Sequence, residues 1–295
     1  LGHEWRPPDN DRSEAIGGYQ RSVCDLLHVR RCWTGSSHIA RAFKMSESER
    51  KVVLVTGSAT GVGRACAVKF ASMGFDAVVN YPGADEEEAK ETVRLVEAQG
   101  VNALLLRCDV SRDDEVVAML AATEKAFGHL DVLVNAAGAT TFVEHEDLQG
   151  LNEEQWDSIL GVNTKGPFFV TRAAVRLLKG RKGAAVVNVS SVAGISGFGS
   201  SIAYCASKGA LNTMTKSLAR ALAPEIRVNA VCPGPIDSRW LRRDMSEEEI
   251  TERVASFPIP QLSSPEDIAD TVSYLAIGTT MTTGQILVVD GGRTM

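Results

Sequence analysis

From residue 51 to the C-terminus, short apolar segments alternate with longer amphipathic ones. The apolar segments, each predicted as a strand, lie at 51–56, 76–81, 102–110, 131–138, 184–191, 226–234 and 284–292. Strands that are apolar on both faces are typical of a parallel sheet covered by helices on both sides. The alternation therefore predicts an α/β fold with a single doubly wound parallel sheet of about seven strands and helices on both faces.

The amphipathic segments predict the helices of this fold. We expect them at 64–73, 85–99, 113–127, 153–178, 204–223, 246–256 and 265–277. Pro167 lies inside the longest of them and predicts a kink there, because proline cannot donate a helical hydrogen bond. No linker rich in proline, glycine or serine divides the chain after residue 44, so residues 45–295 are expected to form a single domain.

The first 44 residues differ from the rest of the chain. They show no sustained helical or strand periodicity, the sequence begins at Leu1, and Met45 precedes the first strand. We expect an N-terminal extension outside the fold, disordered or arising from a mis-assigned start. Residues 21–44 are basic and poor in acids, which also allows an organelle transit peptide or an accessory segment.

Charge and cysteine usage exclude several classes of protein. Asp and Glu outnumber Lys and Arg by 37 to 31, whereas nucleic-acid-binding domains usually carry a basic patch. No apolar run approaches the roughly 18 residues of a membrane-spanning helix. The six cysteines show no CxxC pair and no metal-ligand spacing. We therefore expect no nucleic-acid partner, no membrane partner, no metal site and a reducing, cytoplasmic location.

A glycine-rich turn follows the first predicted strand. Residues 56–63 read TGSATGVG and lead into a predicted helix. Gly57, Gly61 and Gly63 let the backbone approach a pyrophosphate, and the N-terminus of the helix offers free N–H groups to that anion. The spacing is GxxxGxG rather than the GxGxxG of the common dinucleotide fingerprint. The turn alone leaves a methyltransferase as a rival interpretation.

Further motifs follow this turn in a defined order. They are NAAG at 135–138, Ser191 thirteen residues before the YCASK of 204–208, and PG at 233–234. Their order and spacing resemble the short-chain dehydrogenases/reductases over residues 50–295. VVNY at 78–81 and VDGG at 289–292 add a closer similarity to 3-oxoacyl-acyl carrier protein reductases and glucose-dehydrogenase-like members. The resemblance implies a Rossmann-like fold and hydride transfer with a nicotinamide cofactor, and YxxxK is not expected in a methyltransferase.

Tyr204 and Lys208 are the centre of the expected catalytic site. They lie four residues apart in a predicted helix and therefore share one face, although such a pair in isolation is also found on solvated surfaces. A nearby ammonium favours the phenolate and lowers the pKa of a tyrosine. The resemblance implies that Tyr204 exchanges a proton with the substrate oxygen, which Ser191 orients. It also implies that Lys208 holds the nicotinamide ribose and that Asn163 holds a water in a proton relay.

The resemblance also implies the cofactor contacts, which lie in the turn and near the ends of the later strands. They are Gly57, Ser58, Thr60, Gly61, Val62, Gly63, Asn80, Asp109, Val110, Asn135, Ala136, Gly138, Tyr204, Lys208, Pro233, Gly234, Ile236 and Ser238. Asp109 resembles an aspartate that binds adenine, but it is equally suited to cap the next helix. Asn135 resembles an asparagine that steadies the central strands.

The choice between NADP and NAD depends on charge near the second predicted strand. An acid at its end would select NAD, and a base near the ribose would bind the 2′-phosphate of NADP. The strand ends in Asn80 and Tyr81 with no acid before Asp85, and Thr60 stands where family members often place the base. Arg64 lies beyond the turn and also suits a helix surface. We expect NADP, with NAD as the alternative.

Taken together, the residues and the resemblance predict an oxidoreductase that transfers a hydride between NADP(H) and a carbonyl or alcohol. A 3-oxoacyl-thioester reductase is favoured. The alternatives are a sugar, steroid or small-alcohol dehydrogenase and, from a different class, a non-catalytic nicotinamide-nucleotide-binding protein. The expected partner is a small-molecule or acyl-thioester substrate. The resemblance further implies a homotetramer or homodimer.

Overall fold

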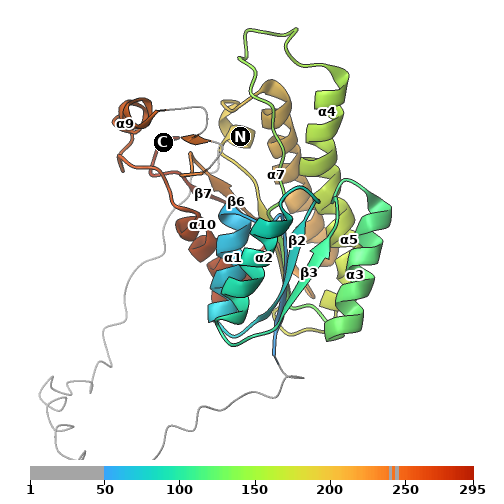
Figure 1. Cartoon of the computed structure of the whole chain (residues 1–295). Helices are drawn as coiled ribbons and strands as arrows, with labels where there is room; N and C mark the ends of the chain where they lie inside the picture. The colour runs from blue at the N-terminus through green and yellow to red at the C-terminus, as the bar shows by residue number, and fades with distance from the viewer. Residues whose placement is uncertain (1–49, 239–240, 243–245) are drawn as a thin grey trace, which may run out of the picture. The chain divides into compact units, whose positions relative to one another are not determined.

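The computed structural model describes residues 50–238, 241–242 and 246–295. Its strands form one parallel sheet in the order β3-β2-β1-β4-β5-β6-β7 (Figure 1). They are β1 (Val52–Thr56), β2 (Asp76–Tyr81), β3 (Ala103–Arg107), β4 (Val132–Asn135), β5 (Ala185–Val189), β6 (Arg227–Pro233) and β7 (Ile286–Val289). The predicted doubly wound α/β fold with one seven-stranded sheet is confirmed. The extension predicted over residues 1–44 lies outside the described residues.

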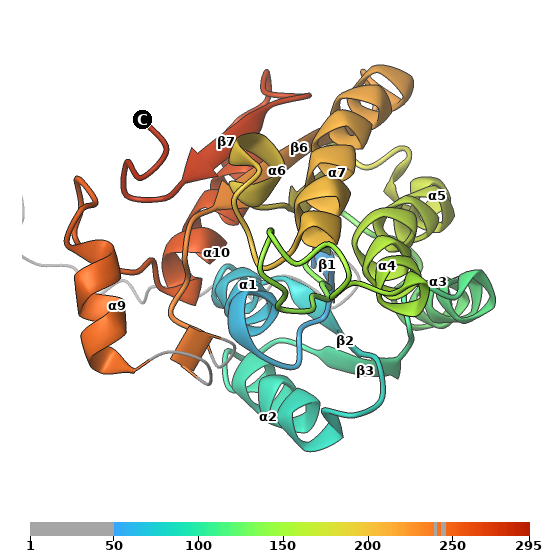
Figure 2. The ribbon, with the colours of Figure 1, turned by 90° about the horizontal axis from the view of Figure 1, so that it is seen from above.

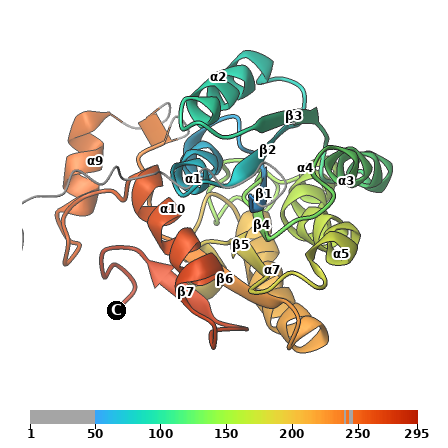
Figure 3. The ribbon, with the colours of Figure 1, turned by 90° about the horizontal axis from the view of Figure 1, so that it is seen from below.

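Helices cover both faces of the sheet. One layer contains α1 (Gly61–Ser72), α2 (Glu86–Glu97) and α10 (Pro265–Ser273). The other layer contains α3 (Asp113–Phe127), α4 (Glu153–Leu160), α5 (Gly166–Leu178) and α7 (Ile202–Leu222). The two layers are seen on opposite sides of the strands from above (Figure 2) and from below (Figure 3). Shorter elements are α6 (Ala193–Ser196), α9 (Glu247–Val254) and the π-helical turn η4 (Tyr274–Gly278).

The packing explains why the strands are apolar throughout. In β1, Val53 and Val55 belong to one core cluster, which also contains Phe70 of α1. Val52 and Leu54 belong to a second cluster with residues of α3 and α5. β1 therefore buries alternate side chains under different helix layers, as a strand covered on both faces requires. The edge strands β3 and β7 are only partly buried.

The helix predicted over residues 153–178 is continuous but not uniform. α4 ends at Leu160, a π-helical turn, η3 (Gly161–Lys165), follows without a gap, and α5 begins at Gly166. Pro167 therefore lies inside this helical segment, as predicted, in the first turn of α5. Because proline has no N–H to donate, the helix is irregular in the turn before it, and the irregularity takes the form of a local widening.

Several strands end earlier than predicted, which moves candidate site residues into loops. β3 ends at Arg107, β4 at Asn135 and β5 at Val189. Because the strands are parallel, the loops that follow them lie along one edge of the sheet, the carboxyl edge, onto which Figure 2 looks. Among the described residues, no helix combines the length and apolar character needed to cross a bilayer.

Candidate active site

A cavity of about 700 Å³ lies along the carboxyl edge of the sheet. It extends from the ends of β2 and β3, past the glycine turn after β1, to the ends of β5 and β6. The predicted site residues that line it are Gly57, Thr60, Gly61, Val62, Gly63, Asn80, Asp109, Val110, Ala136, Gly138, Ser191, Tyr204, Lys208, Pro233, Gly234, Ile236 and Ser238. The structure thus brings residues from many separate segments of the sequence into one cavity, at the point where the strand order reverses between β1 and β4.

Three predicted site residues lie behind the cavity wall instead of lining it. Ser58 is buried, donates a hydrogen bond to Val55 O (2.8 Å) and accepts one from Asn80 N (2.9 Å). Asn135 is buried between strands and donates to Asn188 Oδ1 at 2.9 Å. Asn163 is also fully buried. These side chains support the cavity wall and are not among the groups that line the cavity.

The glycine turn is shaped by contacts that exclude side chains. A Cβ atom on Gly63 would lie 2.2 Å from Gly57 O, and one on Gly57 would lie 2.7 Å from Ala137 Cα. Gly61 has φ +54°, and a Cβ atom added to it would meet no atom within 4 Å. Asn80 Oδ1 accepts a hydrogen bond from Gly57 N at 3.0 Å and so ties the turn to β2. The inner side of the turn is closely packed, while its outer side is open.

The N-terminus of α1 faces this cavity with its backbone donors available. Thr60 precedes the helix, and its side chain makes no capping hydrogen bond. An uncapped helix N-terminus carries unsatisfied N–H groups and a partial positive charge, which suit a phosphate. The residues present therefore fit a dinucleotide whose pyrophosphate would be held by the turn and by the start of α1.

Asp109 does not cap the next helix, because the N-cap residue of α3 is Arg112 and no side chain caps it. Asp109 lines the cavity, and its Oδ1 accepts hydrogen bonds from Ser111 N (2.9 Å) and Ser111 Oγ (2.8 Å).

Pro233 and Gly234 bound the cavity at the end of β6. A Cβ atom on Gly234 would lie 2.7 Å from Asp290 Cβ, so a glycine is required where this segment meets the C-terminal turn.

Tyr204 and Lys208 lie in the first turns of α7, whose start is capped by Ser201 through a hydrogen bond from Tyr204 N (3.3 Å). Burial raises the pKa of Tyr204 to about 12, and a hydrogen bond with Ser191 acts in the opposite direction. Burial lowers the pKa of Lys208 to about 8. Lys208 Nζ donates to Val189 O at 3.0 Å. At neutral pH the site therefore presents a protonated phenol beside an ammonium that loses its proton easily.

This result differs from the sequence expectation for the tyrosine. The ammonium of Lys208 was expected to lower the pKa of Tyr204, but burial has the larger effect and raises that pKa. Desolvation penalises the charged form of both groups and so favours the neutral phenol. The depth of the phenol in the fold could not be read from its spacing to Lys208.

The two neighbouring serines after β5 have different partners. Ser191 Oγ accepts a hydrogen bond from Ala193 N at 3.1 Å, which leaves its O–H available to donate. Ser190 Oγ donates to Lys208 O at 3.3 Å and so holds the backbone of α7. Because the hydroxyl of Ser190 is engaged with Lys208 O whereas Ser191 keeps an O–H to donate, the geometry favours Ser191 as the group that orients a substrate oxygen.

Asn163 lies in the π-helical turn η3 and connects three segments. Its Oδ1 accepts a hydrogen bond from Ala139 N (2.8 Å), and its Nδ2 donates to Ala139 O (2.9 Å) and Ser207 Oγ (3.0 Å). A Cβ atom on Gly138 would lie 3.6 Å from Asn163 Oδ1 and 3.9 Å from Lys208 Nζ. The asparagine thus joins η3, the loop after β4 and α7 close to Lys208.

Several lining residues were not predicted. They are Ala59, Arg64, Pro82, Asp85, Glu88, Cys108, Ala137, Ala139, Val162, Val189, Ser190, Asp237 and Pro265. Arg64, Asp85 and Glu88 stand out because they are charged and lie at the β2–β3 end. The signal for Asp85 and Glu88 was their place at the start of α2, directly after a strand whose carboxyl end faces the cavity.

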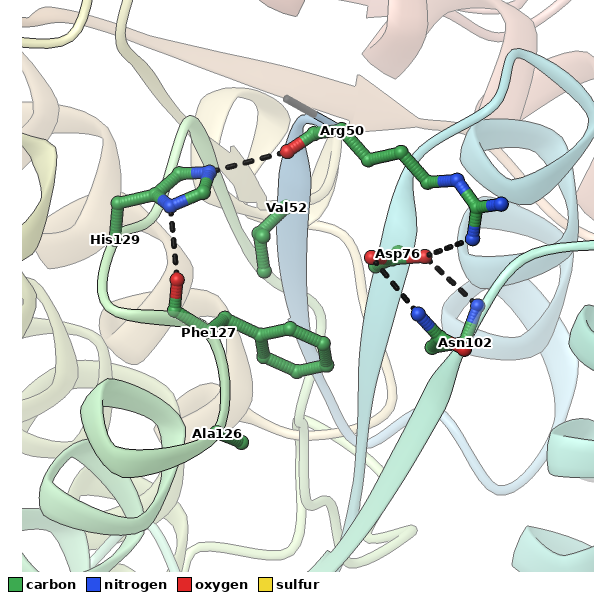
Figure 4. A pocket seen from close by; sticks show the side chains of 7 residues that line it. All are labelled: Arg50, Val52, Asp76, Asn102, Ala126, Phe127 and His129. Carbon is green, nitrogen blue, oxygen red and sulfur yellow. Dashed lines mark hydrogen bonds and ion pairs between the residues drawn. The ribbon is translucent and has the colours of Figure 1, made fainter. Parts of the chain in front are cut away.

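A second hollow, of about 410 Å³, lies at the opposite, amino edge of the sheet (Figure 4). Asp76 accepts hydrogen bonds there from Arg50 Nη1 (3.3 Å) and Asn102 N (2.7 Å). The ring nitrogens of His129 lie 2.9 Å from Phe127 O and 3.1 Å from Arg50 O. These polar groups satisfy one another. Over the described ranges, no group of three His, Cys, Asp or Glu side chains could hold a metal ion.

Comparison with known proteins agrees with this site. A family model described as enoyl-(acyl carrier protein) reductase matches residues 57–294. A 3-oxoacyl-[acyl-carrier-protein] reductase of Staphylococcus aureus is 38% identical over 248 residues, 83% of this chain and 98% of the relative. A Burkholderia xenovorans crystal structure, described as a short-chain dehydrogenase/reductase, is 34% identical with a TM-score of 0.78, covering 83% and 98% of the two chains. A metagenomic blue fluorescent protein in complex with NADPH is 30% identical with a TM-score of 0.76, at the same coverage. With the motifs described above, these matches show that the chain belongs to the short-chain dehydrogenase/reductase family.

Proposed function

We propose that this protein reduces the 3-oxo group of acyl thioesters with NADPH. The observation that carries the proposal is that Tyr204, Ser191 and Lys208 together line one end of a cavity that begins with the glycine turn. The Staphylococcus aureus relative, which is named as a 3-oxoacyl reductase, supports the substrate class.

The side chains account for the proton that such a reduction needs. When bound, a nicotinamide supplies the hydride to the carbonyl carbon. Ser191, whose oxygen already accepts from Ala193 N, donates its O–H to the carbonyl oxygen and orients it. Tyr204 gives its proton to the same oxygen, which gains negative charge as the hydride reaches the carbonyl carbon. The ammonium of Lys208, one helical turn away, then stabilises the phenolate that remains.

The preference for NADPH is part of the proposal. The end of β2 carries Asn80, whose amide is engaged with Gly57 N and with Cys108 O (3.0 Å), and so offers no carboxylate to ribose hydroxyls. The NADPH complex of the metagenomic relative supports the same choice.

We also propose that residues 45–295 form the catalytic domain of a cytoplasmic homo-oligomer, a tetramer or a dimer. Exposed apolar side chains on β7 and η4 support an interface there, since Leu287, Val288, Tyr274 and Ile277 are each more than a third exposed. Light scattering on the purified protein tests the oligomeric state. A monomer in solution would rule out the proposed homo-oligomer.

Absorbance of the reduced nicotinamide tests the reaction. NADPH and NADH are each offered with an acetoacetyl thioester, an enoyl thioester and a panel of ketones, and the oxidised cofactors with sugars, steroids and small alcohols. We expect the fastest oxidation for NADPH with the acetoacetyl thioester. Turnover restricted to sugars, steroids or alcohols would establish the dehydrogenase alternative. Nucleotide binding without any turnover would establish the non-catalytic alternative.

A further inference from the structure

The cavity contains two cationic side chains among the described residues that line it, Arg64 and Lys208. Lys208 lies at the β5–β6 end, where its Nζ bonds Val189 O. Arg64 lies at the other end and bonds Glu88 of α2. Counting the described lining residues alone, each end of the cavity therefore has one cation.

Arg64 is held rigidly between the glycine turn and α2. Its Nη2 donates to Ala59 O (2.6 Å), Glu88 O (2.9 Å) and Glu88 Oε2 (3.0 Å), and its Nε donates to Thr92 Oγ1 (2.9 Å). Thr92 is fully buried, and the side chain of Arg64 is 26% exposed. Within the described part of the chain, Nη1 of Arg64 donates no hydrogen bond, so two of its five N–H groups are available to a ligand.

The chemistry at the two ends decides which half of a dinucleotide meets Arg64. A nicotinamide must lie beside Tyr204 to react, so the adenosine half extends toward the ends of β2 and β3. NADP differs from NAD there by a 2′-phosphate, which requires a cationic partner. Thr60 and Pro82, which line the same end, are uncharged.

We propose that Arg64 is the residue that recognises the 2′-phosphate of NADP(H), with Glu88 and Thr92 as positioning residues that hold its guanidinium. This inference rests on the proposed function and names the cofactor selectivity of the same site. Arg64 follows the third glycine of the turn, whereas the position before the second glycine, where family members often carry the base, is the uncharged Thr60.

The Glu88 carboxylate limits the selectivity that Arg64 provides. Glu88 holds the guanidinium in place but lies beside the position of the incoming phosphate, and Asp85 lines the same end. An arginine paired with a carboxylate attracts a second anion less strongly than an unpaired one. Removing the charge of Glu88 while keeping its shape therefore increases affinity for the 2′-phosphate.

Calorimetry with adenosine 2′,5′-bisphosphate and with 5′-AMP on the full chain tests this role without turnover. For Arg64→Gln we expect affinity for the bisphosphate to fall roughly 10- to 100-fold, the range of a charge-assisted hydrogen bond, with little change for 5′-AMP. Glu88→Gln is expected to bind the bisphosphate several-fold more tightly. The control is Arg94→Gln, which removes an exposed arginine paired with Glu91 on α2 and is expected to change neither affinity.

The unchanged 5′-AMP affinity shows that a variant is folded, and Arg64→Lys, which keeps the charge, should retain part of the bisphosphate preference. An equal loss of both ligands in Arg64→Gln and Arg64→Lys would overturn the proposal, because Arg64 would then only support the turn. Equal wild-type affinity for the two ligands would overturn it as well, while leaving a reductase that uses NADH. If neither fragment, NADPH nor NADH binds the wild-type protein, the proposed function itself fails.

Discussion

Lys208 Nζ lies 5.6 Å from the centroid of the Tyr204 ring and donates a hydrogen bond to Val189 O. The two side chains come from adjacent turns of α7; Lys208 is buried, and Tyr204 is partly buried where it lines the cavity. Burial raises the pKa of the phenol and lowers the pKa of the amine, which keeps the proton on the tyrosine at neutral pH. The arrangement suits reduction, in which a neutral phenol loses its proton next to a positive charge.

The first prediction concerns the phenol oxygen. Tyr204→Phe keeps the ring that packs against Lys208 but removes the proton donor. We expect turnover to fall by roughly 10²- to 10⁴-fold, the usual contribution of a positioned general acid, with little change in NADPH affinity. Steady-state kinetics and fluorescence titration with NADPH measure the two quantities.

The matched control for this variant is Tyr274→Phe, which removes the hydroxyl of an exposed tyrosine in η4. Its turnover is expected to equal that of the wild-type protein. Full turnover in Tyr204→Phe would exclude the phenol as the proton donor, and the mechanism proposed above would fail with it.

The second prediction concerns the cost of burying Lys208. Its pKa is about 8 in the folded protein against 10.5 for a solvated lysine, so between these values the unfolded chain binds more protons than the folded one. Stability from this group therefore rises with pH across that window, and the cost of burial is fully present below it. Relative to Lys208→Met, the wild-type protein should gain about 2 kcal/mol of unfolding free energy between pH 7 and pH 10.

Urea unfolding of both proteins at the two pH values measures this gain. Lys216→Met serves as the control, because Lys216 is exposed on the same helix. A difference between wild type and Lys208→Met that stays constant with pH would show that the buried amine does not titrate as described.

Much of the fold was predictable from the sequence because its signals are local. The apolar strands and the glycine turn specify structure within a few residues. What could not be predicted depends on contacts between distant segments. The pKa of Tyr204 depends on burial under several elements, and the place of Arg64 in the cavity depends on Glu88 and Thr92 of α2.

The predicted site likewise has features that the local sequence indicates and features that depend on contacts between distant segments. Motif positions identified most of the residues that line the cavity and also the three that support its wall, but for Ser58 they did not distinguish the two roles. Ser58 and Asn135 belong to the motifs and yet point into the protein, where they bond Val55 O and Asn188. A motif records which residues a site needs, and only the packing distinguishes a contact from a support.

The third prediction concerns the support that Asn163 provides. Asn163→Ala removes the hydrogen bonds that join η3 to Ala139 and to Ser207. Leaving the Ala139 N–H and C=O without these partners should cost about 1–3 kcal/mol of unfolding free energy. Hydrogen exchange at the Ala139 amide should become faster, and turnover should fall because Lys208 lies beside the loosened segment.

Asn152→Ala is the comparison for this variant. It removes the asparagine that caps the exposed start of α4, through Gln155 N, and should cost about 1 kcal/mol without changing exchange at Ala139. Unchanged exchange at Ala139 in Asn163→Ala would contradict the supporting role assigned to the π-helical turn.

The fourth prediction separates two glycines of one turn. A Cβ atom on Gly63 would lie 2.2 Å from Gly57 O and 2.9 Å from Ser58 Cα, both backbone atoms that cannot turn aside. Gly63→Ala should therefore lower the unfolding free energy by about 3 kcal/mol or more, since overpacking of rigid surroundings is costly. Its melting temperature should fall clearly below that of the wild-type protein.

Gly61→Ala should lose more NADPH affinity than stability, whereas Gly63→Ala should mainly lose stability. The new methyl group meets no atom within 4 Å, so the cost is the strain of an alanine at φ +54°, about 1–2 kcal/mol. The methyl group would instead stand on the cavity side of the turn, where the pyrophosphate must approach the backbone. We therefore expect a modest loss of stability and a large loss of NADPH affinity, measured by calorimetry. If Gly61→Ala binds NADPH as tightly as the wild-type protein, the open side of the turn is not where the phosphates lie.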